Sequence, residues 1–256
     1  MNVLEGMFLG VLQGITEWLP ISSSGQSMLF LINIFHIAPE EAFSIAIMLH
    51  LGSLFAVVFY FREKLRNVFL QDRKLLSFLI VGTIASGVVG LPVYVELRNL
   101  FSSVSGEAVT MLIGVMLIVT GMVLKNTKKA IRQDFNTSDA LIVGGAQGIA
   151  VLPGISRSGT TIAALLLRGV EQETALSLSF LLAIPAILGL VVIESSSVVL
   201  SVPVLVGVAT SFVVSLAAMH YFLALAKKVD FSNFCIAVGA LAFFVPLFFI
   251  ALEGIL

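Results

Sequence analysis

Six apolar segments constrain this chain more than any other feature of its sequence. They cover residues 43–61, 76–96, 105–124, 174–193, 201–226 and 234–252. A helix of roughly 20 apolar residues crosses the ~30 Å hydrocarbon core of a bilayer, and each segment has about that length. Strands of a membrane barrel would instead alternate in hydrophobicity along the chain. The segments therefore predict six membrane-spanning helices.

The small number of charges also predicts a membrane environment. Only 11% of the residues are charged, whereas a soluble domain has about 25%. The chain therefore has too few polar groups to cover a folded surface in water. We predict an all-α, multi-pass integral membrane protein with a single domain, residues 1–256. The net charge of −1 indicates no nucleic-acid partner, and the single cysteine, Cys235, excludes an internal disulfide.

Two further apolar regions, residues 1–38 and 138–168, are interrupted by polar residues. Each contains a proline followed by a short run with serine and glycine: Pro20 with residues 22–25, and Pro153 with residues 156–159. The arm after the first break, roughly residues 27–38, would be only about 18 Å long as a helix. We predict that both regions are re-entrant broken helices. Such backbone is tolerated at membrane depth only when it is buried in protein or lines a wet cavity.

The two interruptions are copies of one segment. Residues 13–25 and 147–159 share Gln-Gly-Ile at their starts and Ile-Ser-x-Ser-Gly at their ends, with a constant offset of 134. A second match supports a duplication, since Glu40, Ala42, Ser44 and Leu49 align with Glu173, Ala175, Ser177 and Leu182. We predict two structural repeats, about residues 1–125 and 135–256.

The distribution of Lys and Arg predicts the orientation of the chain. The connections 62–75, 125–137 and 227–231 contain five, four and two basic residues, whereas 97–104 contains one and 194–200 none. The basic connections should face the cytoplasm, which places both termini outside. An odd number of spans separates the two broken regions, so the repeats are inverted relative to each other. Inverted repeats place polar sites near the bilayer midplane, where broken helices meet.

The serines after each break are candidates for binding an anion. Ser22, Ser23, Ser24 and Gly25 follow Pro20, so a serine can cap the helix that follows. A helix start has free N–H groups and a partial positive charge, which favour phosphate, and a hydroxyl there could act as a nucleophile. The alternative is that these serines only satisfy buried backbone groups.

The second copy has an arginine in the same position. Arg157 lies where the first copy has Ser23, and it is flanked by Ser156, Ser158 and Gly159. A guanidinium binds phosphate with two parallel hydrogen bonds. Arginine inside a membrane is rare and marks a functional site by default. The alternative is a shallower loop from which Arg157 reaches the interface.

Glu17 is the acidic counterpart of this arginine. It lies four residues after Gln13, on the same helix face. A carboxylate at membrane depth must be paired, protonated or bound to a cation. Mg²⁺ binds through one or two carboxylates together with substrate phosphates, so Glu17 is a candidate metal ligand. The alternatives are a general base and a structural ion pair with Arg157.

His50 lies inside a predicted span. A neutral histidine that packs through a hydrogen bond is one interpretation, and an acid–base group near the site is the other.

Both interruptions resemble the motifs of the undecaprenyl-diphosphatase family, the bacitracin-resistance phosphatases that recycle polyprenyl diphosphate. The first motif reads QGITEWLPISSSGQ over residues 13–26, and the second reads PGISRSG over residues 153–159. The resemblance covers essentially the whole chain.

The resemblance implies hydrolysis of an undecaprenyl-type diphosphate to the monophosphate carrier lipid, which returns the carrier to cell-envelope glycan synthesis. It implies a plasma-membrane enzyme whose site opens toward the outer face, with a divalent cation, Mg²⁺ or Ca²⁺. The oligomeric state stays open, with a homodimer as one possibility.

The resemblance also implies roles for individual residues. Glu17 would be the metal ligand or acid–base carboxylate, Ser23 the nucleophile, and Arg157 a group that holds the diphosphate. The remaining motif positions belong to the substrate-binding set: Gln13, Ser22, Ser24, Gly25, Gln26, Gly154, Ser156, Ser158 and Gly159.

One position departs from the family pattern. Gln26 replaces the histidine that follows the serine run, and an amide can be neither a phosphohistidine nor a proton shuttle. Either Ser23 or a metal-bound water attacks, or His50 supplies the missing base. Inverted repeats with broken helices also fit a transporter or flippase, and a structural scaffold is a third alternative.

Overall fold

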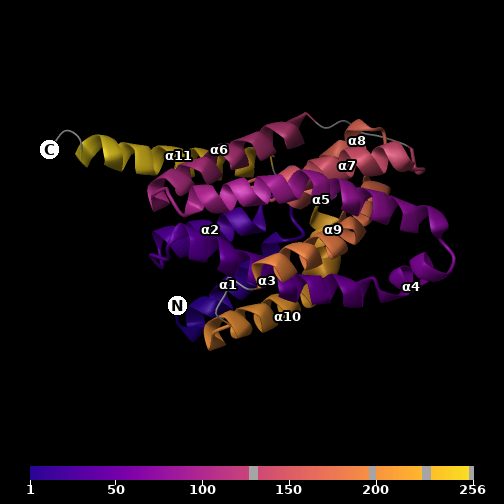
Figure 1. The fold of residues 1–256 in the computed structure, drawn as a ribbon, viewed down its shortest axis with the longest axis horizontal. Helices are drawn as coiled ribbons and strands as arrows, with labels where there is room; N and C mark the ends of the chain where they lie inside the picture. Colours follow the sequence, from indigo (N-terminus) through magenta and orange to yellow (C-terminus); the bar gives the residue numbers. More distant parts are fainter. Residues whose placement is uncertain (127–131, 196–199, 227–231, 254–256) are drawn as a thin grey trace.

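A computed structural model describes residues 1–126, 132–195, 200–226 and 232–253. Within these ranges the chain forms eleven helices and no strand, with one isolated bridge between Arg132 and Val170 (Figure 1). The prediction of an all-α fold is confirmed. The helices are α1 Val3–Thr16, α2 Ser23–Asn33, α3 Pro39–Tyr60, α4 Arg62–Leu70, α5 Arg73–Phe101, α6 Gly106–Lys125, α7 Thr137–Ile149, α8 Arg157–Leu167, α9 Gln172–Glu194, α10 Val202–Ala226 and α11 Ser232–Glu253.

Four helices in the described part of the chain, α3, α5, α6 and α9, are long and apolar enough to cross a membrane. Each coincides with one of the predicted apolar segments to within one residue at the segment's ends or encloses it. The described apolar parts of α10 and α11, Val202–Ala217 and Ser232–Phe248, are shorter. The fold is therefore that expected of a multi-pass membrane protein.

Both predicted interruptions break the helix at the expected place. The first separates α1 from α2, and the second separates α7 from α8. In each break a serine caps the following helix: Ser22 Oγ accepts from the Gly25 N–H at 3.3 Å, and Ser156 Oγ accepts from the Gly159 N–H at 3.1 Å. Helices α2 and α8 have 11 residues each, about 17 Å of rise, so neither can cross a bilayer alone.

The helices that precede the breaks also begin in the same way. Asn2 caps α1 and Asn136 caps α7, and each forms a reciprocal capping box with the acidic residue three positions later, Glu5 or Asp139. Such a box satisfies two backbone N–H groups that would otherwise lack partners at a helix start.

Each of these preceding helices packs along one long helix, α1 on α10 and α7 on α5. The contacts pass through glycines. A Cβ on Gly10 would lie 2.3 Å from the carbonyl oxygen of Gly207, and a Cβ on Gly144 would lie 2.3 Å from that of Gly82. Small residues allow helix backbones to approach closely in lipid, where no hydrophobic effect drives association.

The helices that flank the two breaks pack against α3 and α9. Helices α1 and α2 contact α3, helix α8 contacts α9, and α3 and α9 contact each other. Trp18, in the first break, is fully buried and meets Phe180 of α9 edge to face at 5.3 Å. Large aromatic contacts of this kind fix how the break sits on the core.

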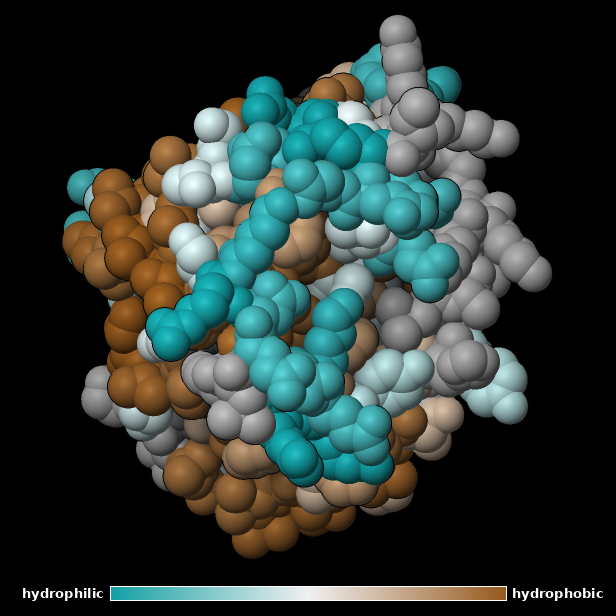
Figure 2. All heavy atoms as spheres, turned by 90° about the vertical axis from the view of Figure 1, so that its right-hand side faces the viewer, coloured by the Kyte–Doolittle hydropathy of each residue, from teal (hydrophilic) through white to brown (hydrophobic). Residues whose placement is uncertain are grey.

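One end of the molecule is markedly polar. Figure 2 shows hydrophilic side chains gathered across the middle of the end at which α4 lies, with apolar surface to the left and below. The basic residues of the 62–75 connection are exposed at this end: Arg62, Lys64, Arg66, Arg73 and Lys74. The basic connection 227–231 and the lysines at 128 and 129 lie outside the described residues.

Candidate active site

The two breaks, 134 residues apart in sequence, contact each other directly. Ser22 Oγ accepts a hydrogen bond from the Gly154 N–H at 3.0 Å, and Ser158 Oγ donates to the Leu19 carbonyl at 3.1 Å. A Cβ on Gly25 would lie 2.8 Å from the Gly154 nitrogen. Gly154 itself has φ +96°, a left-handed conformation that favours glycine. The glycines therefore let the two breaks pack backbone against backbone.

Glu17 is the centre of the polar contacts, and it is only 5% exposed. One carboxylate oxygen, Oε1, pairs with the Arg157 guanidinium. The other, Oε2, accepts from Gln13 Nε2 at 3.0 Å and from Ser23 Oγ at 2.6 Å. His50 Nε2 lies 3.2 Å from the same oxygen. A carboxylate is stable in such a buried place because charge and donors surround it.

The hydroxyl of Ser23 lies between two groups that can take its proton. Its Oγ is 2.6 Å from Glu17 Oε2 and 3.3 Å from His50 Nε2. His50 Nδ1 is 2.7 Å from the Ala46 carbonyl, which can only accept, so Nδ1 bears a proton. In the neutral ring, Nε2 is then a bare acceptor beside Ser23. A nucleophile next to a base that a third group orients is the usual arrangement for activating a hydroxyl.

Arg157 is the first residue of α8, and its side chain is 14% exposed. Besides Glu17, it donates to the Ser179 carbonyl at 3.3 Å. The break behind it is held by Thr120 of α6, whose hydroxyl donates to the Gly154 carbonyl at 3.0 Å and accepts from the Ser156 N–H at 3.1 Å. The guanidinium is thus placed at a helix start, where N–H groups already favour an anion.

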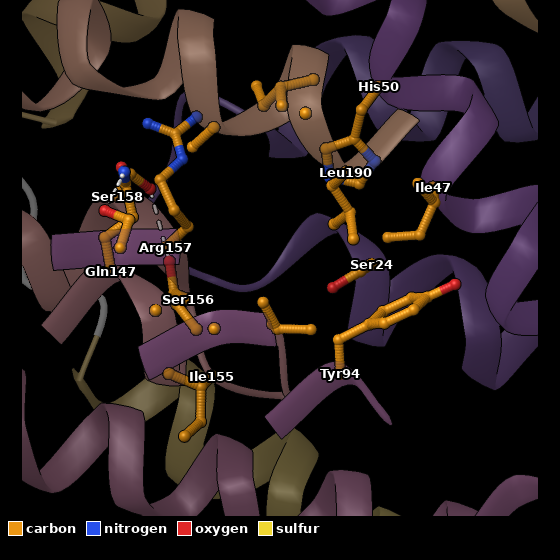
Figure 3. Close-up of a pocket in the computed structure, with 18 of the residues that line it drawn as sticks. Ser24, Ile47, His50, Tyr94, Gln147, Ile155, Ser156, Arg157, Ser158 and Leu190 are labelled. Atoms are coloured by element: carbon orange, nitrogen blue, oxygen red, sulfur yellow. Dashed lines mark hydrogen bonds between the residues drawn. The ribbon is translucent and has the colours of Figure 1, made fainter. Parts of the chain in front are cut away.

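These groups line a cavity of about 280 Å³. In Figure 3, Arg157, Ser156 and Ser158 lie on one side of it, and His50 and Ser24 lie on the other. The predicted site residues that line the cavity are Glu17, Ser22, Ser23, Ser24, His50, Ser156, Arg157 and Ser158. Acid, hydroxyl, imidazole and guanidinium groups are therefore brought together in one space.

Five predicted substrate-binding residues lie behind this lining: Gln13, Gly25, Gln26, Gly154 and Gly159. Gln13 holds the Glu17 carboxylate from the α1 side, and Gln26 Nε2 donates to the Ile21 carbonyl at 3.2 Å. The three glycines belong to the packed breaks. These residues contact the residues that line the cavity.

The cavity also has lining residues that the sequence reasoning missed, chiefly Ser86 and Tyr94 of α5 and Gln147 of α7. Gln147 Nε2 donates to Ser86 Oγ at 3.0 Å, and its Oε1 is buried without a hydrogen-bond partner among the described residues. A signal existed for Gln147, because it repeats Gln13 at the same offset of 134. Ser86, Gly90 and Tyr94 recur at every fourth position and so share one face of α5.

The residues that could hold a cation are few. The described part of the chain contains no group of three or more His, Cys, Asp or Glu side chains that could enclose a metal. Glu17 is the acidic residue of the cavity lining, and the buried Oε1 of Gln13 beside it has no hydrogen-bond partner among the described residues. Because Mg²⁺ commonly binds through one carboxylate, waters and substrate phosphates, the donor set fits a cation that arrives with a phosphorylated substrate.

Comparison with known proteins gives consistent matches over almost the entire chain. A family model described as "Bacitracin resistance protein BacA" matches residues 6–244. A protein named undecaprenyl-diphosphatase from Methanothrix thermoacetophila is 40% identical over 245 residues, 93% of this chain and 95% of that protein. A protein of the same name from Methanopyrus kandleri is 43% identical over 252 residues, 93% of this chain and 94% of that protein.

Proposed function

Since the chain belongs to the bacitracin resistance protein BacA family, we propose that it hydrolyses an undecaprenyl-type polyprenyl diphosphate to the monophosphate and phosphate. The product is the carrier lipid that cell-envelope glycan synthesis reuses. The observation that carries the proposal is the convergence of Glu17, Ser23, His50 and Arg157 on one cavity between apolar helices.

The diphosphate binds first at Arg157. The guanidinium forks match two phosphate oxygens, and the N–H groups at the starts of α2 and α8 add partial positive charge. Without substrate, Glu17 compensates the buried charge of Arg157. The incoming diphosphate replaces this carboxylate on the guanidinium, which frees Glu17 for chemistry.

Ser23 is the nucleophile in this proposal. Its hydroxyl passes a proton to Glu17 or to His50 Nε2, both of which contact it. The Ser23 oxygen forms a bond to the terminal phosphorus while the bond from that phosphorus to the bridging oxygen breaks, which releases the polyprenyl monophosphate. Water then cleaves the phosphoserine and gives inorganic phosphate. Positioning and charge neutralisation supply most of the catalysis in phosphoryl transfer, so Gln26 needs no direct role.

A divalent cation, Mg²⁺ or Ca²⁺, would be held by Glu17 together with substrate oxygens. When bound, it would neutralise charge on the diphosphate and lower the barrier to transfer. Gln13 and Ser23 would adjust around it, since both contact the same carboxylate oxygen.

The wider architecture in this proposal has six spans and two inverted repeats in the plasma membrane, with both termini outside and the site opening outward. The support is that the caps, the breaks and the helix contacts occur twice. Helix α1 contacts α2 as α7 contacts α8, and α1 packs along α10 as α7 packs along α5. The basic, polar end formed by α4 supports a cytoplasmic assignment for that face (Figure 2). A homodimer stays a prediction.

Phosphate release from a long-chain polyprenyl diphosphate in proteoliposomes tests the function. The purified chain should release phosphate, and Glu17→Ala should lower the rate at least ~100-fold, or ~2.7 kcal/mol of barrier. Movement of the lipid across the bilayer without phosphate release would instead favour the transporter hypothesis. Normal turnover by the Glu17 variant would end the proposal.

A further inference from the structure

The cavity continues from the polar site toward the space between α5 and α9. From α5 its lining includes Gly87, Gly90 and Leu91, and from α9 it includes Ala186, Gly189 and Leu190. These six residues define what we name the α5–α9 window. Ile47, His50 and Leu190, all labelled in Figure 3, line the same cavity, so its lining includes both apolar residues and catalytic groups.

Close contacts join the two helices on both sides of the window, one before it and one after it along α5. A Cβ on Gly82 would lie 2.8 Å from Leu182 Cδ1, so α5 and α9 touch closely there. Twelve residues later along α5, the Tyr94 hydroxyl donates to Glu194 at 2.5 Å, and Arg98 donates to the same carboxylate at 3.0 Å. The distance along α5 between the two junctions is roughly 18 Å.

Open space adjoins both helices between these junctions. A Cβ built on Gly87 or on Gly189 would have no atom within 4 Å, although both glycines line the cavity. The neighbouring outward residues are well exposed: Val88 is 70% exposed and Val192 62%. In a membrane, such exposed apolar side chains face lipid.

We infer that the α5–α9 window holds the isoprenoid tail of the substrate and that Gly87 and Gly189 set its capacity for a long chain. This rests on the proposed function. The occupant follows from continuity: a diphosphate at Arg157 is covalently joined to an apolar chain, and the apolar end of the same cavity leads out between α5 and α9. The Tyr94–Glu194 hydrogen bond joins α5 to α9 beyond the window, so the chain leaves sideways into lipid between the two junctions.

The test fills the window without touching the polar groups. Gly87→Leu and Gly189→Leu place a side chain into open space, so the packing of the helices should be preserved. Gly145→Leu is the matched control, because Gly145 lies on α7 outside the cavity lining and its Cβ would meet Val89 Cγ2 at an ordinary 3.9 Å. Each variant is assayed on a long-chain polyprenyl diphosphate and on a water-soluble short-chain prenyl diphosphate.

The window predicts that kcat/KM for the long-chain substrate falls at least ~10-fold in both window variants, as expected when a hydrophobic site loses room. Turnover of the short-chain substrate by both window variants should stay near that of the parent chain. The control Gly145→Leu should match the parent chain on both substrates. Unchanged turnover of the long-chain substrate, or an equal loss of turnover on both substrates, would overturn the proposal that the window holds the isoprenoid tail. Failure of the parent chain to release phosphate from either substrate would instead overturn the proposed function.

Discussion

Replacing Arg157 by alanine, alone and together with a substitution of Glu17, separates the contribution of Arg157 to stability from its contribution to catalysis. The guanidinium is the charged partner of Glu17, whose carboxylate is only 5% exposed. Removal of one member of a buried pair costs about 3–5 kcal/mol when nothing else compensates the charge. Here Gln13 and Ser23 still donate hydrogen bonds to the carboxylate, so we expect a loss near 3 kcal/mol, at the low end of that range.

The double variant Glu17→Gln/Arg157→Ala removes both charges. Stability should recover by about 1–2 kcal/mol relative to Arg157→Ala, because no uncompensated charge remains buried. Activity should not recover: both variants should lose at least ~100-fold in phosphate release, about 2.7 kcal/mol of barrier. Arg62→Ala is the matched control, since Arg62 is exposed and its pair with Glu63 spans 4.0 Å; an exposed pair contributes about 0–1 kcal/mol.

Thermal unfolding in detergent gives the stability arm, and phosphate release from a long-chain polyprenyl diphosphate gives the catalytic arm. If Arg157→Ala retains turnover within about tenfold of the parent chain, the guanidinium does not bind the diphosphate and the reasoning is refuted. If the double variant regains activity along with stability, Glu17 and Arg157 form only a structural pair.

Four further perturbations have defined outcomes. Ser23→Ala should abolish phosphoserine formation in an acid-quenched reaction, whereas Ser24→Ala should retain it; a phosphorylated protein from the Ser23 variant would refute the serine nucleophile. His50→Ala should lower turnover about 10²-fold, and unchanged turnover would leave His50 a packing residue. EDTA should stop phosphate release and Mg²⁺ or Ca²⁺ should restore it, while full activity in chelator would exclude a cation. Burial raises the pKa of Asp139, but hydrogen bonds from Arg168 and Arg132 outweigh it, so the net shift of the pKa is downward. The stability that this shift gives is complete above the ordinary carboxyl pKa and is lost as pH falls through the lowered value. Asp139→Asn should therefore flatten the loss of thermal stability at acidic pH, and a pH dependence identical to that of the parent chain would contradict this.

The sequence was most informative where polar residues interrupt apolar ones. Ser22 and Ser156 occupy helix caps because a serine hydroxyl at a helix start satisfies an exposed N–H group, a local rule that sequence alone contains. The apolar segments likewise predicted the helices, because bilayer thickness fixes the length of a span. Contact between the two breaks was also foreseeable, since a repeated polar break inside lipid needs a partner.

The sequence could not decide how the polar groups would pair. Glu17 was a candidate metal ligand, a base or the partner of Arg157, and the structure contains the ion pair. It also places His50 against both Glu17 and Ser23. These contacts depend on how α3 and α8 are positioned against α1, which no local pattern specifies.

The cavity wall was the least predictable part. Ser86 and Tyr94 belong to α5, whose long apolar sequence indicates only a span. Their place in the wall depends on how α5 packs against α7 and α9. That packing includes contacts between residues far apart in sequence, such as the one from Tyr94 to Glu194 at 2.5 Å. Small polar residues inside an apolar helix have no motif by which to be recognised.

The most direct measurement is an experimental structure of the chain with a non-hydrolysable polyprenyl diphosphonate in lipid. The terminal phosphonate should lie within hydrogen-bond distance of both the Arg157 guanidinium and the Ser23 hydroxyl, with Glu17 no longer paired to Arg157. A diphosphonate bound elsewhere, or a guanidinium still closed on Glu17 with the ligand present, would contradict the account.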